Sequence, residues 1–342
     1  MQLRRAAVEA PGITRRRRGR GFSYETPSGA AVDDETLERI RALAIPPAWA
    51  DVWICPHANG HIQAAGTDAA GRRQYLYHER WRARRDGEKF DRMIAFARVL
   101  PRMRERVAAD LGVAGLPRPK ALACAVRLLD QALFRIGSET YARQNGSFGL
   151  ATLRKEHVGI RGDLIVFDFA AKSGQRRVQE VRDPQVLPAI RSMKRRRNGG
   201  AELLAFREGE RWRDVRSADV NDYLREVAGD EFTAKDFRTW HATVLAAAAL
   251  AAKAGEATAA TSGRRLVSAA VREVAEYLGN TPAVARASYI DPRVVDRFEQ
   301  GRTIADTMER LRTDDLTAPG VRETVEAAVL DLLEEEPVAR AA

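Results

Sequence analysis

Cysteine is scarce in this sequence: only Cys55 and Cys124 occur among 342 residues, far apart along the chain. Two isolated cysteines make no disulfide framework, and such usage is typical of a protein from a reducing compartment. Long apolar runs are also missing, because the best candidate, 244–252, is mostly alanine and far shorter than a bilayer span. The charged N-terminus, with Arg4 and Arg5, has no apolar signal-peptide core behind it. We therefore expect a cytoplasmic protein.

The signatures of two kinds of phosphate chemistry are absent as well. The sequence has no Gly-x-x-x-x-Gly-Lys-Ser/Thr phosphate loop, which argues against an ATP-driven motor. Its carboxylates do not cluster in the Asp-x-Asp pattern of a two-metal nuclease. Cys55, His57 and His61 lie close together, but without a fourth zinc ligand nearby they are better interpreted as ordinary sheet residues. We expect neither a metal nor any other cofactor.

Positive charge, in contrast, is plentiful. Lysine and arginine number 57 against 47 acidic residues, which leaves a net charge of +10. From Arg302 onward there are 5 basic and 10 acidic residues, so this C-terminal tail carries −5 and residues 1–301 carry +15. A basic body with an acidic tail fits a polyanion such as nucleic acid. A solvated, generally arginine-rich surface would explain the same numbers, so charge alone does not decide.

Residues 1–90 are expected to form a small β-rich domain. Residues 1–22 contain four consecutive arginines among glycines and indicate a flexible basic arm. A helix is expected over roughly 34–43. Short β-type runs broken by proline and glycine occur on both sides of it, with turn chemistry at 68–71; they cover 22–24, 52–55, 61–64 and 74–77. These runs predict a small antiparallel sheet.

Residues 91–342 are expected to form a mostly α-helical domain, which makes the fold class α+β. The apolar spacing becomes helical after Lys89 and predicts a helix that ends near Leu111, followed by a loop. A second long helix is expected over 121–142. The β-type residues of 164–169 and 176–181 flank a turn at 172–174 and predict a hairpin. Further helices are expected at roughly 184–197, 217–228, 233–252, 266–278, 282–288 and 321–335.

Five polar residues of this second domain stand out. Arg135 is expected late in the second long helix, Lys172 at the hairpin tip, and Arg238 in the run KDFRTWH. Asn280 follows a Leu-Gly pair, and Tyr289 comes nine residues later. Taken singly, each is more simply a solvated, capping or packing residue. Their common order and spacing is what carries information.

With these residues in view, the chain resembles the small type IB DNA topoisomerases of bacteria and poxviruses along nearly its full length. The active site of that family is Arg, Lys, Arg, His or Asn, and Tyr, in this chain order. The five residues Arg135, Lys172, Arg238, Asn280 and Tyr289 match it, with similar flanks and intervals. The N-terminal runs IPPAW, GHIQA and GRRQY, which begin at positions 45, 60 and 71, also resemble the DNA-clamping β-domain of the family.

The resemblance implies a reaction in which Tyr289 attacks a phosphodiester of duplex DNA, forms a 3′-phosphotyrosyl link and releases a 5′-hydroxyl. Religation then needs neither ATP nor a metal. Arg135 and Arg238 would stabilise charge on the non-bridging oxygens, and Lys172 would protonate the leaving oxygen. Poxvirus-type enzymes have histidine at the position of Asn280, whereas bacterial members commonly have asparagine. A neutral amide can still donate to a phosphoryl oxygen, so this departure bears on the rate rather than the reaction type.

The resemblance also implies DNA contacts in the N-terminal domain, at Arg72, Gln74, Tyr75 and Tyr77. Strand alternation would put the two tyrosines on one face and Gln74 on the other, and a packing role for one tyrosine stays open. The family further implies a monomeric, C-shaped clamp on double-stranded DNA, and therefore a protein associated with the nucleoid.

Two other classes of protein remain open at this point. A tyrosine recombinase shares the Arg–Lys–Arg–Tyr logic, but such enzymes act as tetramers, with a helical DNA-binding domain in front. They also typically have His-x-x-Arg, where this chain has Lys235-x-x-Arg238. A non-catalytic DNA-binding protein would use the basic surface alone, and would bind with steep salt dependence without changing the linking number.

Overall fold

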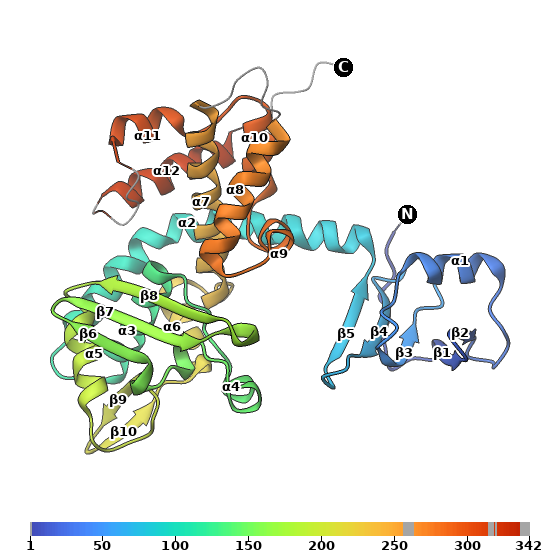
Figure 1. The fold of residues 1–342 in the computed structure, drawn as a ribbon, viewed down its shortest axis with the longest axis horizontal. Helices are drawn as coiled ribbons and strands as arrows, with labels where there is room; N and C mark the ends of the chain where they lie inside the picture. The colour runs from blue at the N-terminus through green and yellow to red at the C-terminus, as the bar shows by residue number, and fades with distance from the viewer. Residues whose placement is uncertain (1, 256–262, 314–317, 319, 336–342) are drawn as a thin grey trace. The chain divides into compact units, whose positions relative to one another are not determined.

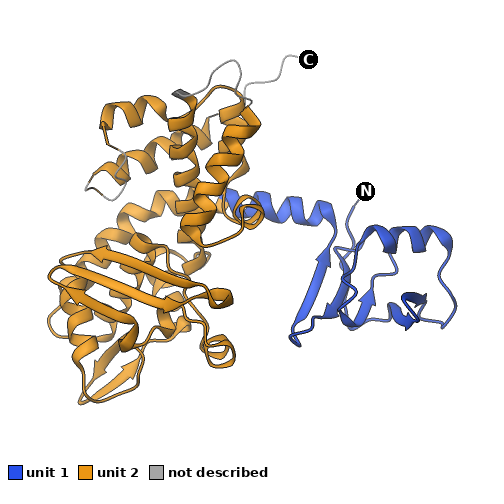
Figure 2. Ribbon diagram, viewed as in Figure 1, with its two compact units in different colours: residues 1–91 blue, residues 92–342 orange. Residues whose placement is uncertain are grey.

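The computed structural model describes residues 2–255, 263–313, 318 and 320–335. The chain divides into two compact units, residues 1–91 and 92–342 (Figure 2). Unit 1 is built on a β-sheet and unit 2 is mostly helical (Figure 1), so the expected α+β class is confirmed. No helix in the described ranges is both long and apolar enough to cross a bilayer.

Unit 1 is organised by a five-stranded antiparallel sheet in the order β2-β1-β3-β4-β5. Its strands are β1 (Ile13–Arg18), β2 (Gly21–Glu25), β3 (Ala50–Ile54), β4 (Ile62–Thr67) and β5 (Arg73–Tyr77). Helix α1 (Asp34–Ala42) begins after Asp33, whose carboxylate accepts a hydrogen bond from the Thr36 N–H at 2.7 Å. Ile40 of this helix packs with Ile54 and its apolar neighbours to form the core of the unit. The helix predicted at 34–43 and the four predicted strands are confirmed.

The expectation of a flexible basic arm over residues 1–22 is wrong, because Ile13–Arg18 forms strand β1 inside the sheet. The first residue of the strand is buried in the core. The Arg15 guanidinium lies over the Phe22 ring, 4.2 Å from its centre, and donates to the carbonyl of Pro46 at 3.1 Å. An arginine whose donors are met by backbone carbonyls can lie on the inner face of a sheet, which a count of charges does not reveal.

Unit 2 begins within a long helix, α2 (Glu79–Gly112), which starts earlier than the change of spacing at Lys89 indicates. The predicted 121–142 helix is wrong in its second half, because α3 (Arg118–Ala132) ends at Leu133, which has a left-handed φ of 53°. The chain stays non-helical until α4 (Glu139–Asn145). In between, the carbonyls of Arg135 and Ile136 accept hydrogen bonds, both 2.8 Å, from the short 3₁₀ turn η1 (Leu150–Thr152). This pairing competes with helix continuation and has no local signature in the sequence.

Two small antiparallel sheets follow. The first contains β6 (Val158–Arg161), β7 (Leu164–Ala170) and β8 (Arg176–Arg182) in chain order. The predicted hairpin is confirmed as β7 and β8, whereas β6 lies outside the prediction. The second sheet contains β9 (Ala205–Glu208) and β10 (Arg211–Asp214), which the sequence analysis did not predict either. Strands of four residues are too short to show a clear alternation.

The remaining helices complete unit 2. They are α5 (Val186–Arg195), α6 (Ser217–Ala228), α7 (Ala234–Gly255), α8 (Gly263–Leu278), α9 (Pro282–Ser288), α10 (Pro292–Glu299), α11 (Ala305–Leu311) and α12 (Val321–Glu334). All except α10 and α11 match predicted helices within a few residues. Helices α7, α8 and α10–α12 gather in one group and the small strands in another, and α3 contacts members of both (Figure 1). The acidic tail expected from Arg302 onward contains α11 and α12; its residues 314–317, 319 and 336–342 lie outside the described part.

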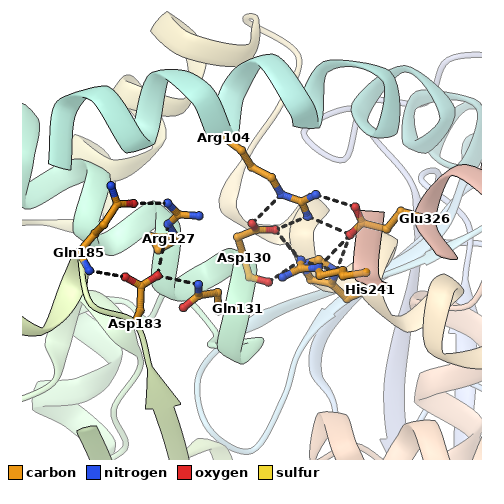
Figure 3. Close-up of polar contacts among 9 residues, drawn as sticks. Arg104, Arg127, Asp130, Gln131, Asp183, Gln185, His241 and Glu326 are labelled. Carbon is orange, nitrogen blue, oxygen red and sulfur yellow. Dashed lines mark hydrogen bonds and ion pairs between the residues drawn. The ribbon is translucent and has the colours of Figure 1, made fainter. Parts of the chain in front are cut away.

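A buried ionic network ties α12 to the middle of unit 2 (Figure 3). Arg104 of α2 donates to the carboxylates of Asp130 on α3 and Glu326 on α12, at 2.7–3.0 Å. Arg322 of α12 donates to Asp130 at 2.6 Å and contacts the His241 ring of α7 at 2.9 Å. Because every charge is paired, removing one member would leave a buried charge uncompensated, at a cost of about 3–5 kcal/mol. The network therefore fixes the junction of four helices, among them α3 and α7.

This network predicts a loss of stability in mild acid. Burial, together with the charge of Arg322, lowers the pKa of His241 below its ordinary value of about 6.5. The unfolded chain then binds more protons than the folded one as the pH drops below about 6.5, so the free energy of unfolding falls. Burial opposes ionisation of Asp130, but Arg322 and Arg104 outweigh it and hold the pKa of that carboxyl well below its usual range. The contribution of Asp130 is therefore lost only in much stronger acid.

We predict that His241→Gln flattens the dependence of unfolding free energy on pH between about pH 7 and about pH 5. The difference in slope from the unsubstituted protein should reach up to about 1.4 kcal/mol per pH unit. Urea unfolding of both proteins at a series of pH values measures it. Parallel slopes would show that His241 takes up its proton as easily in the folded state as in the unfolded one.

Candidate active site

Arg135 lies in the extended segment after α3, and not within a helix as expected. Gly149 and Gly137 approach so closely here that a Cβ at position 149 would lie 2.5 Å from backbone atoms of Gly137. This contact, with the hydrogen bonds to η1, holds the backbone that carries Arg135. The side chain donates through Nη2 to the carbonyl of Gly279 at 2.9 Å and to Oδ1 of Asn280.

Arg238 belongs to α7 and is almost fully buried, with 3% of its surface exposed. Its guanidinium donates to the carbonyls of Leu133, which ends α3, and Leu278, which ends α8. The central carbon of the same guanidinium lies 5.4 Å from the centre of the Tyr289 ring. One arginine thus contacts the ends of two helices and the tyrosine.

Asn280 follows the C-terminus of α8, where the chain forms a Schellman motif. Gly279 has a left-handed φ of 61° and donates to the carbonyl of Glu276 at 3.0 Å, while the Asn280 N–H donates to that of Ala275 at 2.9 Å. Glycine accepts this φ without strain, which explains the Leu-Gly-Asn order. Because Oδ1 of Asn280 accepts from Arg135, the amide nitrogen Nδ2 is left as a donor. It is buried and has no hydrogen-bond partner in the described part of the chain.

Tyr289 comes directly after α9, and its backbone is held from two sides. Its N–H donates to the carbonyl of Ala285 at 3.0 Å, and its carbonyl accepts from the hydroxyl of Thr243 at 3.3 Å. Thr243 is fully buried on α7, the helix that also carries Arg238. The half-buried ring of Tyr289 therefore has a backbone fixed relative to Arg238.

Lys172 occupies the turn between β7 and β8, as expected, and its side chain is exposed. The turn is tight, because Ser173 and Gly174 have left-handed φ values of 65° and 72°, and Ala171 donates to the carbonyl of Gln175 at 2.8 Å. Lys172 forms no hydrogen bond or ion pair with any residue that the structure describes. Four of the five predicted residues are therefore brought together, and Lys172 is not in contact with them.

A third guanidinium, that of Arg177 on β8, belongs to the same cluster, and the sequence interpretation missed it. It lines a narrow cavity together with Arg135 and Arg238. Within the described ranges, none of these three guanidiniums forms an ion pair with a carboxylate. Their acceptors are backbone carbonyls and the amide oxygen of Asn280. Alternation along β8 assigns residue 177 to one face of the strand. It does not predict that this face contacts the end of α8.

The cluster carries positive charge in partly desolvated surroundings. Burial and the neighbouring charge of Arg135 lower the pKa of Arg238 to about 10. Burial also lowers the pKa of Arg135 and of Arg177. All three guanidiniums remain protonated at neutral pH, and no carboxylate in the described ranges compensates their charge. A phosphodiester has one negative charge and several acceptor oxygens, so it would offset part of this charge and could accept from Asn280 Nδ2.

The four residues predicted to contact DNA in the N-terminal domain lie on or directly before β5, an edge strand of the unit 1 sheet. Tyr75 and Tyr77 are on one face of β5, 42% and 40% exposed, with stacked rings whose centres are 6.2 Å apart. Gln74 alternates to the opposite face and donates to the carboxylate of Asp68 at 2.8 Å. Arg72 forms an ion pair with the same carboxylate at 2.9 Å. The tyrosines are thus open to a ligand, whereas Arg72 and Gln74 are engaged within the unit.

The chain is similar to DNA topoisomerases over most of its length. The sequence model described as the catalytic core of eukaryotic DNA topoisomerase I matches residues 78–315. The one described as the N-terminal domain of bacterial DNA topoisomerase IB matches residues 21–68. The chain is 32% identical to DNA topoisomerase 1B of Acanthamoeba polyphaga mimivirus, over 82% of this chain and 85% of that protein. It is 20% identical to DNA topoisomerase 1B of Vaccinia virus (strain Copenhagen), over 83% of this chain and 88% of the viral protein.

Proposed function

Because the chain belongs to the type IB DNA topoisomerase family, we propose that it relaxes supercoiled duplex DNA by cutting and resealing one strand through Tyr289. The observation that carries the proposal is the cluster of Arg135, Arg177 and Arg238 beside this tyrosine, none of which forms an ion pair with a described carboxylate. Buried positive charge of this kind is partly compensated when a DNA phosphate enters, which brings phosphorus to the phenol oxygen.

In the proposed cleavage step, the phenolic oxygen of Tyr289 forms a bond to the phosphorus and the bond to the 5′-oxygen breaks. The protein is then joined to the 3′ end, and the phenolic proton leaves to solvent. Arg135 and Arg238 stabilise the negative charge that grows on the non-bridging oxygens. The free donor Nδ2 of Asn280 adds one neutral hydrogen bond to the same oxygens.

Religation is the reverse attack by the 5′-hydroxyl on the phosphotyrosyl bond. Because the energy of the phosphodiester is kept in that bond, the cycle uses no ATP. The leaving 5′-oxygen needs a proton on departure, and we assign this role to Lys172. Its exposed position at the tip of the β7–β8 turn leaves its ammonium group available for bound DNA rather than for other parts of unit 2.

Unit 1 is proposed to supply further DNA contacts, mainly through Tyr75 and Tyr77, to a protein that acts as a monomer. The two exposed rings offer apolar area with a polar tip. We expect the double change Tyr75→Phe and Tyr77→Phe to have little effect on relaxation at low salt. At higher salt, relaxation should become distributive sooner than in the unsubstituted protein, because phosphate contacts are already weakened there. Equal processivity of the two proteins throughout a salt series would remove the tyrosine hydroxyls from the interface.

Relaxation of negatively supercoiled plasmid, in the presence of EDTA and without ATP, is the direct test of the proposed function. A ladder of topoisomers that ends in relaxed circles is expected. A protein that only binds DNA would shift the plasmid on a gel without changing its linking number once the protein is removed.

A further inference from the structure

The C-terminus of α8 ends in backbone carbonyls that face arginine side chains. The last carbonyls of a helix have no partner within it, and the helix dipole places partial negative charge there. The carbonyls of residues 276 and 277 accept from Arg177 at 3.4 and 2.7 Å; those of 278 and 279 accept from Arg238 and Arg135, both at 2.9 Å. One helix end thus assembles three like charges at one place.

Arg177 differs from the other two arginines in the elements that it connects. It lies on β8, the strand that leaves the Lys172 turn, and its guanidinium contacts the last turn of α8, directly before the residues that carry Asn280. The turn fits against it closely, because a Cβ on Gly279 would lie 3.1 Å from Nη1 of Arg177. Both terminal nitrogens of this guanidinium donate to α8 carbonyls.

We propose that Arg177 is a positioning residue for strand cleavage, which fastens the end of α8 to the β7–β8 hairpin and so holds the Asn280 amide in place. The inference rests on the proposed function. Arg135 binds both Gly279 and Asn280, so any movement of this turn displaces the amide donor and Arg135 together. A displacement of about 1 Å at a reacting centre can lower a rate by about 10²-fold.

The test is single-turnover cleavage of a duplex that carries a nick close to the scissile phosphate, so that the released fragment cannot be resealed. Arg177→Ala should slow cleavage by about 10- to 100-fold at saturating protein, where a change in DNA affinity does not limit the rate. The matched control is Arg176→Ala. Arg176 is the preceding residue of β8, is exposed and forms an ion pair with Asp168 at 2.6 Å. The Arg176→Ala variant loses the same charge from the same strand and should cleave at close to the unsubstituted rate.

A double-mutant cycle with Asn280→Ala separates positioning from general damage to the fold. If Arg177 acts through Asn280, Arg177→Ala should slow cleavage much less in the Asn280→Ala background than in the unsubstituted protein. Rates that multiply would overturn the proposal, as would an unimpaired Arg177→Ala.

If the alanine variant is unstable, Arg177→Lys is used for the same measurement. Lysine keeps the charge but cannot span both carbonyls, so an intermediate rate is expected. Full activity of Arg177→Lys would mean that charge alone matters and would also overturn the proposal. Failure of the proposed function itself would look different, because the unsubstituted protein would then form no covalent adduct.

Discussion

Replacing Tyr289 with phenylalanine should abolish covalent attachment to DNA while leaving DNA affinity nearly unchanged. Phenylalanine keeps the ring but removes the only oxygen that can attack phosphorus in the proposed reaction. The backbone contacts of position 289, to Ala285 and Thr243, do not involve that oxygen and should persist. The contact between the Arg238 guanidinium and the aromatic ring should persist as well.

The measurement is a denaturing gel of a labelled duplex with a nick near the cleavage site, after incubation with each protein. Unsubstituted protein should give a band of DNA joined to protein, and Tyr289→Phe should give none at any time. Tyr277→Phe is a suitable control, because Tyr277 is an exposed tyrosine at the end of α8 whose side chain has no place in the proposed chemistry. A covalent band from Tyr289→Phe would reassign the nucleophile.

Lys172→Ala should slow cleavage of ordinary DNA by about 10²–10⁴-fold, the usual contribution of a general acid. Without the ammonium group, the 5′-oxygen must leave as a strongly basic alkoxide. The variant should fold normally, because Lys172 is exposed and makes no polar contact within the described residues. Single-turnover cleavage at saturating protein measures the effect separately from DNA binding.

A substrate with sulfur in place of the bridging 5′-oxygen distinguishes a proton donor from a source of charge. A thiolate is far less basic than an alkoxide and leaves without a proton. Lys172→Ala should therefore cleave this substrate at close to the unsubstituted rate. Arg135→Ala is the comparison. The non-bridging oxygens, which Arg135 is proposed to stabilise, are unchanged in the sulfur substrate, so this variant should still cleave it slowly. Equal impairment of Lys172→Ala on both substrates would rule out the general-acid role.

The residues of the candidate site show which features can be predicted from local sequence and which cannot. Leu-Gly-Asn at 278–280 indicates a helix end followed by a left-handed glycine, and the Schellman motif is there. The turn that holds Lys172 between two β-type runs is equally local, because hairpin register depends on residues near in sequence. Arg135 is the contrary case. The helical pattern continues through it, yet α3 ends at Leu133 because the following carbonyls bond to η1.

The sequence by itself determined the α+β class, the residue ranges of most helices, and the order of the five residues that resemble the family's active site. These depend on apolar periodicity, turn chemistry and chain order, which are properties of neighbouring residues. Tertiary structure alone decided that Arg15 finds its acceptors among the carbonyls of residues 45–49 and that Arg177 joins the cluster. It also decided that the end of α8 gathers three guanidiniums. The reason is physical: each depends on a carbonyl that becomes an acceptor only when elements far apart in the chain have packed together.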